Sequence, residues 1–370
     1  MRRLWPRLVI VLSVLGSAHY YIWLRFVHAP RLPAPWHTLA TLLIICLAPS
    51  LPLAAIGMRR WSRAAAAPLL WLTYTWFGCA VYLLLAAAAT SLVCAIAPVS
   101  PRAAAVVCGG AAALTVLYGL INVKRGPIVR RIRVPLAKLP AAADGYTIVQ
   151  LTDVHIGPML GRRFAASVVQ QVNALDPDLI VITGDLVDGR LADLVPHVEP
   201  LRELRARDGV FAVTGNHEYY WNASAWLTHL GSLGIRILRN EHVTIEAGFE
   251  LAGVDDSTSA GMAVGHGEDV AGALAGRDPA LPVVLLAHHP STIARAVAAG
   301  CDLQLSGHTH GGQLLPLGWL SRLFEPRVAG LARFGATWLY VSEGTGFWGP
   351  PLRVGTSCEI AEITLACPAP

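Results

Sequence analysis

The sequence has little charge, and the charge it has is unevenly placed. Only 14% of its 370 residues are charged, whereas about a quarter is usual for a soluble protein. Residues 1–143 contain 15 Lys or Arg and no Asp or Glu, so residues 144–370 carry a net charge of −10. The overall charge of +5 therefore does not indicate a nucleic-acid binder, because the basic residues flank apolar runs and the remainder is acidic. The composition predicts a membrane-embedded first part and an acidic soluble domain.

Cysteine shows no functional pattern. Four of the seven cysteines lie in apolar runs, and the other three are Cys301, Cys358 and Cys367. No spacing resembles a zinc ribbon or a disulfide framework, and no repeat of 20 to 50 residues is present. We therefore expect most cysteines to be small core residues, and any metal ligands to be oxygen and nitrogen atoms.

Long apolar runs fill the first third of the chain. Four of them approach the roughly 20 residues that a helix needs to cross a bilayer, namely Leu8–Leu24, Leu39–Gly57, Pro68–Thr90 and Ala103–Val123. Pro49 and Pro52 are expected to kink or end the second span. A cleavable signal ending near Gly16-Ser17-Ala18 is the alternative for the first run, and it leaves three spans.

Basic residues flank these runs asymmetrically. Twelve lie before the first run, after the second or after the fourth, and three lie in the alternate loops. The positive-inside rule then places both termini in the cytosol. We expect an integral protein of a bacterial-type inner or plasma membrane with a transmembrane helical module over 1–125, a basic, Pro/Ala-rich linker over 126–143, and a cytoplasmic domain over 144–370.

The soluble part alternates short apolar runs with amphipathic segments. Helices are expected over 162–175, 192–207 and 291–299, and after Trp221. Strands are expected over 146–152, 178–183, 210–213, 235–238, 243–245, 250–254, 283–287, 303–306, 337–341 and 360–365. This alternation predicts an α/β domain.

Polar side chains follow five of these strands. Seven of them offer carboxylate, amide or imidazole ligands, namely Asp153, His155, Asp185, Asn216, His288, His308 and His310. In α/β sheets, ligands bind beyond the carboxyl ends of strands, so these residues should meet. Such ligands suit Mn, Fe, Zn or Co. One ion cannot use seven ligands, whereas two ions about 3.5 to 4 Å apart can share a bridging carboxylate, which predicts a dinuclear centre.

The same residues form motifs in a known order. Asp153-Val154-His155, Gly184-Asp185-Leu186-Val187-Asp188, Gly215-Asn216-His217-Glu218, His288-His289-Pro290 and Gly307-His308-Thr309-His310 together resemble the five motifs of calcineurin-like metallophosphoesterases. The resemblance covers about 146–365. Gly311-Gly312-Gln313 and Pro351-Leu352-Arg353 resemble the YkuE-type branch, which carries N-terminal membrane segments. The resemblance implies a four-layer αββα sandwich.

The resemblance also implies a role for each residue. One ion is held by Asp153, His155 and His310, a second by Asn216, His288 and His308, and Asp185 bridges them. His217 is left to face the substrate, stabilise the phosphoryl charge and protonate the leaving oxygen. Glu218, where the family often has Asp, is expected to orient His217. Hydroxide bridging two divalent ions, Mn, Fe or Zn, would attack phosphorus directly, without a covalent intermediate.

Several neighbouring residues allow two interpretations. Asp188 either orients a ligand or the loop after Asp185, or caps a turn. His289 is expected to point away from the ions, and Asp255 and Asp256 are candidates for the rim of the site.

The apolar segment 314–320, with Phe324, Phe347 and Trp348, either receives a lipid tail or packs as scaffold.

Four functions remain open at this stage. A membrane-bound phosphodiesterase or pyrophosphatase acting on a lipid-linked substrate, similar to UDP-diacylglucosamine by analogy only, is favoured over a phosphomonoesterase or nucleotide phosphodiesterase acting on soluble substrates. An acidic domain without a basic groove disfavours a nuclease, and no nucleic-acid partner is expected. The complete ligand set disfavours a non-catalytic membrane scaffold. The expected partners are a phosphorylated small-molecule or lipid substrate and membrane lipids.

Overall fold

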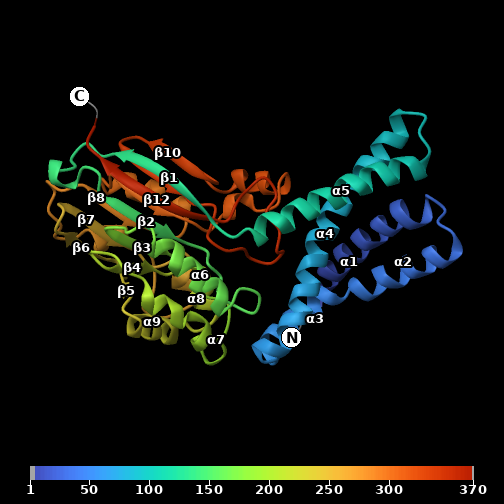
Figure 1. Cartoon of the computed structure of the whole chain (residues 1–370), viewed down its shortest axis with the longest axis horizontal. Helices are drawn as coiled ribbons and strands as arrows, with labels where there is room; N and C mark the ends of the chain where they lie inside the picture. Colours follow the sequence, from blue (N-terminus) through green and yellow to red (C-terminus); the bar gives the residue numbers. More distant parts are fainter. Residues whose placement is uncertain (1–4, 369–370) are drawn as a thin grey trace. The chain divides into compact units, whose positions relative to one another are not determined.

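The computed structural model describes residues 5–368 and divides the chain into two units. The first unit comprises the residues up to Ile121 together with Gly349–Val354, and the second comprises Asn122–Trp348 and the residues from Gly355 onward. Each unit is coloured along the chain in Figure 1.

The first unit is helical. Its helices are α1 (Trp5–Trp23), which continues as a π-helix to His28, then α2 (Ala34–Leu47), α3 (Ser50–Arg60), α4 (Arg63–Ile96) and α5 (Pro101–Lys124), whose last turn belongs to the second unit. Four stretches in the described part are long and apolar enough to cross a membrane, Val9–His28, Ala34–Met58, Arg63–Ile96 and Pro101–Lys124. Pro49 separates α2 from α3, as expected.

The segment Gly349–Val354 packs within this helical unit. The Arg353 backbone N–H donates to the carbonyl of Gly119 on α5, and the Arg353 side chain is fully buried. A Cβ atom at Gly78 or Gly119 would press on Leu352. Glycine at these two helix positions therefore makes room for the returning chain.

The second unit contains two six-stranded mixed sheets, drawn in Figure 1. The first has the order β1-β12-β2-β3-β4-β5, with strands β1 (Ile128–Pro135), β2 (Thr147–Leu151), β3 (Leu179–Thr183), β4 (Val210–Val213), β5 (Arg236–Ile237) and β12 (Glu359–Ala366). The second has the order β10-β11-β9-β8-β7-β6, with strands β6 (Glu241–Ile245), β7 (Phe249–Gly253), β8 (Val283–Leu286), β9 (Leu303–Ser306), β10 (Gly330–Phe334) and β11 (Thr337–Val341).

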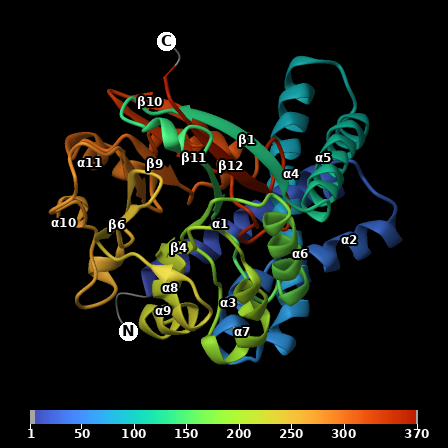
Figure 2. The ribbon, with the colours of Figure 1, turned by 60° about the vertical axis from the view of Figure 1, so that its left-hand side comes forward.

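Side chains alternate between the two faces of each strand and so pack into separate layers of the domain. Ile148 and Val181 point into the core between the sheets, whereas Val149 and Ile182 point to the opposite face of the first sheet. That outer face is covered by α6 (Arg162–Asn173), α7 (Leu191–Val198) and α9 (Ala223–Ser232). The outer face of the second sheet is covered by α10 (Val270–Ala273) and α11 (Ile293–Ala298), and Figure 2 shows α11 beside β9. The resulting order of layers is αββα.

Two strands fall outside the sequence-based expectation. The expected linker contains β1, which pairs in parallel with β12 from Ile128 to Pro135. Its arginines bind acidic residues of β12, with Arg130 Nε 2.7 Å from Glu359 and Arg131 Nε 2.7 Å from Glu362. A charged strand of this kind lacks the apolar alternation by which strands are recognised. β10, at the edge of the second sheet, was likewise not expected.

Candidate metal centre

The seven predicted ligands converge at one edge of the two sheets. β2, β3 and β4 are mutually parallel, as are β7, β8 and β9, so the residues after their carboxyl ends meet. Five of the seven have positive φ, namely Asp153, His155, Asp185, His308 and His310. Non-glycine residues rarely adopt this conformation, and it concentrates where the surrounding structure fixes functional groups.

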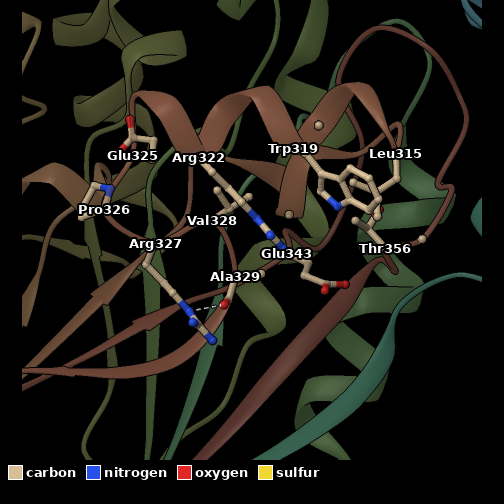
Figure 3. A pocket seen from close by; sticks show the side chains of 13 residues that line it. Leu315, Trp319, Arg322, Glu325, Pro326, Arg327, Val328, Ala329, Glu343 and Thr356 are labelled. Atoms are coloured by element: carbon tan, nitrogen blue, oxygen red, sulfur yellow. Dashed lines mark hydrogen bonds between the residues drawn. The ribbon is translucent and has the colours of Figure 1, made fainter.

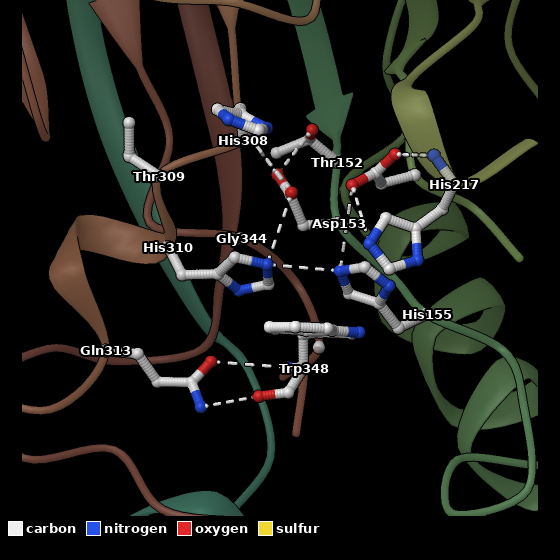
Figure 4. A network of polar contacts seen from close by, with 12 residues as sticks. Thr152, Asp153, His155, His217, His308, Thr309, His310, Gln313, Gly344 and Trp348 are labelled. Atoms are coloured by element: carbon white, nitrogen blue, oxygen red, sulfur yellow. Dashed lines mark hydrogen bonds and ion pairs between the residues drawn. The ribbon is translucent and has the colours of Figure 1, made fainter. Parts of the chain in front are cut away.

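The first cluster contains Asp153, His155 and His310, all buried, and Figure 4 shows their side chains pointing toward one another. The His310 Nε2 atom lies 3.3 Å from Asp153 Oδ1 and 3.1 Å from His155 Nε2. Two imidazole nitrogens and a carboxylate oxygen at this separation could hold one divalent ion.

The second cluster surrounds Asp185 and His288. The His288 Nε2 atom lies 3.3 Å from Asp185 Oδ2 and 3.3 Å from His308 Nδ1. Asp185 Oδ2 also lies 4.0 Å from His155 Nε2, so this carboxylate reaches both clusters. Asp185 could therefore contribute an oxygen to either cluster.

Asn216 tests whether these residues fit a metal. Its amide nitrogen donates to the Tyr220 hydroxyl at 3.1 Å, but its buried Oδ1 atom has no hydrogen-bond partner among the described residues. A buried carbonyl oxygen without a partner is costly unless a cation or water satisfies it. Because this oxygen completes a set of nitrogen and oxygen ligands, the residues fit a pair of divalent ions.

Glycine positions bring the ligand loops into close contact. A Cβ atom at Gly215 would collide with the Asp185 carboxylate, and one at Gly307 would collide with Thr152 Oγ1 and Asp153 Oδ2. The motifs therefore require glycine before Asn216 and His308 for steric reasons, since any side chain would displace a carboxylate ligand.

Glu218 holds the backbone of the site. Its carboxylate accepts the N–H groups of Asp185, Leu186, Val187 and Gly215 at 2.7 to 3.2 Å. Glu218 was expected to orient the His217 ring. In the structure its carboxylate oxygens accept hydrogen bonds from main-chain amides instead. Burial and the nearby Asp185 charge raise the pKa of Glu218 to about 7, while the amides act in the opposite direction.

Asp188 contacts the His217 ring. The Asp188 Oδ1 atom lies 2.9 Å from His217 Nδ1 and accepts the indole N–H of Trp221 at 3.2 Å. Burial acts to lower the pKa of His217, but the hydrogen bond to Asp188 and the charge of Asp185 outweigh it and raise this pKa to about 9. The His217 Nε2 atom lies 3.8 Å from Asp185 Oδ2, so the ring faces the cluster of predicted ligands.

The pKa values of the predicted ligand histidines are shifted in different directions. Burial lowers the pKa of His155 to about 4, and burial together with the His288 charge lowers the pKa of His308 to about 3. For His288, burial is outweighed by Asp185, which raises its pKa well above the usual value.

The residues beside the ligands also have defined places. His289 packs on His308 with ring centroids 3.8 Å apart and has Nε2 3.1 Å from Asp256 Oδ2, so it lies nearer the ligands than expected. Asp255 instead forms a bidentate ion pair with Arg239 at 2.8 and 3.0 Å.

Aromatic side chains flank His217. Its ring centroid lies 4.9 Å from that of Tyr220 and 5.6 Å from that of Trp348, and both aromatic residues are about half exposed. Gln313 fixes Trp348 by hydrogen bonds with its backbone N–H and carbonyl at 3.2 and 2.9 Å, as Figure 4 shows. Phe347 is buried. Tyr220 was missed by sequence reasoning, although its place four residues after Asn216 on α8 (Asn216–Tyr220) was a usable signal.

The fold, together with the candidate ligands at one edge of the two sheets, defines a metallophosphoesterase domain. The calcineurin-like phosphoesterase family matches residues 146–312, and the chain belongs to the calcineurin-like metallophosphoesterase family. Among its relatives, the Bos taurus transmembrane protein with metallophosphoesterase domain is 42% identical over 67% of this chain and 59% of its own length.

Two further relatives are similar to about two thirds of this chain. The Danio rerio transmembrane protein with metallophosphoesterase domain is 39% identical over 68% of this chain and 60% of its own length. The Bacillus subtilis uncharacterized metallophosphoesterase YkuE is 30% identical over 61% of this chain and 81% of its own length. The chain thus spans about 60% of the two transmembrane relatives that it matches.

Proposed function

We propose that this protein is a membrane-anchored, dinuclear-metal phosphoesterase that hydrolyses a phosphodiester or pyrophosphate. The observation that carries the proposal is the convergence of seven oxygen and nitrogen ligands around Asp185, with His217 beside them and paired to Asp188. One ion would be held by Asp153, His155 and His310 and the other by Asn216, His288 and His308. Mn, Fe and Zn all suit this set.

When bound, two such ions supply an activated water nucleophile and offset the charge of the phosphoryl oxygens. The chain's own residues then hold the site in place and protonate the departing oxygen. Asp188 holds the His217 ring, and His217 Nε2 delivers a proton to the departing oxygen. Glu218 keeps the loop that carries Asp185 in place through three of its amides and links it to the amide of Gly215. No side-chain nucleophile is required by this scheme.

The substrate is proposed to be lipid-linked, with UDP-diacylglucosamine as the example of the class. Support comes from the four apolar helices, which would tether the domain to a bilayer, and from the half-exposed Tyr220 and Trp348 beside His217. Their flat faces suit a base or another planar group of the substrate. The basic residues that flank the apolar helices support a cytosolic location of the domain in a bacterial-type membrane.

The test is Mn-dependent release of UMP from UDP-diacylglucosamine in detergent, with bis(p-nitrophenyl) phosphate as a soluble diester. Release of UMP, lost in Asp185→Asn, would support the lipid-linked assignment. Hydrolysis of the soluble diester alone would support the metal-dependent chemistry but would indicate that the substrates are soluble phosphoesters. Inactivity on both substrates with Mn, Fe and Zn would favour a non-catalytic membrane scaffold.

A further inference from the structure

The backbone directly after the predicted ligand His310 is unusual. Four consecutive residues lie in the left-handed region, with φ of 52°, 63°, 84° and 43° for His310, Gly311, Gly312 and Gln313. Glycine adopts such angles freely, whereas a residue with a Cβ atom adopts them at a cost in energy. A Cβ atom at Gly312 would lie 2.7 Å from the Gly318 backbone, so that position requires glycine. Gln313 is a larger residue in the same run, and strain of this kind persists only where other contacts enforce it.

The side chain of Gln313 makes such contacts with Trp348. Its amide nitrogen donates to the Trp348 carbonyl at 2.9 Å, and its amide oxygen accepts the Trp348 backbone N–H at 3.2 Å, as Figure 4 shows. Only a side-chain amide offers a donor and an acceptor of this kind without carrying a charge. Gln313 is buried, so both hydrogen bonds are shielded from water. Gln313 therefore holds the Trp348 backbone at two points.

Holding this backbone places the indole of Trp348 beside His217. The two ring centroids are 5.6 Å apart, and the ring planes are nearly perpendicular at 79°. The neighbouring Phe347 is buried, whereas the Trp348 side chain is half exposed. The indole N–H makes no hydrogen bond to any residue that the structure describes. An exposed indole on a fixed backbone is thus available to a ligand, because it is not used in packing the core.

Tyr220 supplies a second aromatic ring beside His217. Its ring centroid lies 4.9 Å from that of His217, and its side chain is also half exposed. The Tyr220 hydroxyl accepts the side-chain N–H of Asn216 at 3.1 Å, which ties the ring to a predicted metal ligand. Asp188 is already paired with His217 Nδ1 at 2.9 Å. The two uncharged rings therefore offer flat faces that favour an uncharged planar group.

We propose that Gln313 is a positioning residue for a subsite that binds a planar aromatic group of the substrate. Gln313 sets Trp348 beside His217, and Trp348 and Tyr220 stack on a nucleobase or an aryl ring that the phosphoester carries. The inference deepens the proposed function and rests on it, because it takes His217 as the group that protonates the departing oxygen. It makes the planar group the part of the substrate that determines specificity.

The first experiment compares ligands with and without a planar group. The full chain is purified in non-ionic detergent with Mn²⁺, and its affinities for uridine monophosphate, phenyl phosphate and ribose 5-phosphate are measured by calorimetry. Ribose 5-phosphate has the phosphate but lacks the ring. Stacking predicts that at least one ring-bearing ligand binds about tenfold more tightly than ribose 5-phosphate. The tighter of the two ring-bearing ligands identifies the group as a nucleobase or an aryl ring.

Variants of the two residues test their separate roles. Trp348→Leu should abolish the preference for a ring, and Trp348→Phe, which keeps a flat face, should retain part of it. Gln313→Ala should lose most of the preference although the indole is still present. Gln313→Glu keeps the acceptor and loses the donor, so it should lose less.

Trp319→Leu is the matched control. Trp319 is 55% exposed, close to the 50% of Trp348, and lies in the same unit. It lines another cavity, of about 460 Å³, which Figure 3 shows and which none of the seven predicted metal ligands lines. This variant should therefore keep the wild-type preference for a ring.

A second experiment observes the indole directly. The chain is labelled with 5-fluorotryptophan, and the fluorine NMR signal that disappears in Trp348→Phe is assigned to Trp348. Uridine, which has no phosphate, should shift this signal in the wild type and leave the Trp319 signal in place. In Gln313→Ala the Trp348 signal should move even without ligand, because the backbone that carries it is released.

Three results would overturn the proposal. The first is equal affinity for the three ligands, or binding of none of them, in the wild type. The second is a preference for a ring that persists in Trp348→Leu. The third is a Trp348 fluorine signal and a ring preference that are both unchanged in Gln313→Ala and Gln313→Glu. Neither readout uses turnover, so failure of the proposed function would appear as absent hydrolysis with ring-dependent binding intact, and the two failures are distinguishable.

Discussion

Replacing Asp188 with Asn tests the proton donor of the site. Asp188 Oδ1 lies 2.9 Å from His217 Nδ1, and this contact together with the charge of Asp185 outweighs burial and raises the pKa of His217 to about 9. Asparagine has nearly the same shape and carries no charge. The substitution should therefore lower the pKa of His217 while the ring keeps its place.

The structure sets the size of the effect. A hydrogen bond to a charged group contributes about 1.5 to 3 kcal/mol, and one pKa unit corresponds to about 1.4 kcal/mol, so the pKa of His217 should fall by about one to two units. His217 then loses its proton at lower pH. Activity at pH about 8.5 should fall about threefold to 25-fold, and activity at pH about 6 should change little.

The assay is the pH profile of kcat for Asp188→Asn with an aryl and an alkyl phosphodiester. Loss should be larger for the alkyl ester, because its leaving oxygen depends more on protonation. Asp193→Asn, which breaks the exposed pair with Arg190, is the matched control. Since Asp188 Oδ2 also lies 3.7 Å from His155 Nδ1, metal content is measured in parallel. An unchanged alkaline limb at full metal content would refute the role of His217 as the proton donor.

Three other predictions follow from the site. Glu218→Gln should destabilise the protein by about 1 to 3 kcal/mol, because an amide cannot accept four N–H groups equally; thermal unfolding of the metal-free form measures this. Gly215→Ala should lower metal content by displacing Asp185, whereas Gly231→Ala, with open space around it, should not; elemental analysis separates them. Mn binding near pH 7 should release protons because the pKa of His288 is raised, and the apparent metal affinity should therefore increase with pH. Calorimetry in two buffers measures the proton release, and finding none would contradict this prediction.

The convergence of the candidate ligands was predictable because their placement follows from local rules. A polar residue directly after a buried parallel strand must lie at the carboxyl edge of the sheet, as Asp153 and Asp185 do. Pro49 within the second apolar run likewise locates the break between α2 and α3. Each inference uses residues close together in sequence.

The remaining features depend on contacts between distant residues. The pairing of Asp188 with His217 joins loops 29 residues apart, and nothing near Glu218 in the sequence distinguishes a carboxylate that binds amides from one that binds an imidazole. β1 forms because Arg130 meets Glu359, which lies 229 residues away. The packing of Gly349–Val354 within the helical unit requires Gly78 and Gly119, and no local pattern near Leu352 reveals it.

Counting metal ions in the wild type and in Asp185→Asn, together with phosphodiester hydrolysis, tests the central claim most directly. The position of Asp185, 3.3 Å from His288 and 4.0 Å from His155, leads us to predict two divalent ions per wild-type chain and Mn-dependent hydrolysis. The variant should lose at least one ion and nearly all activity. Full metal content and activity in Asp185→Asn, or a single ion in the active wild type, would contradict a dinuclear phosphoesterase centre.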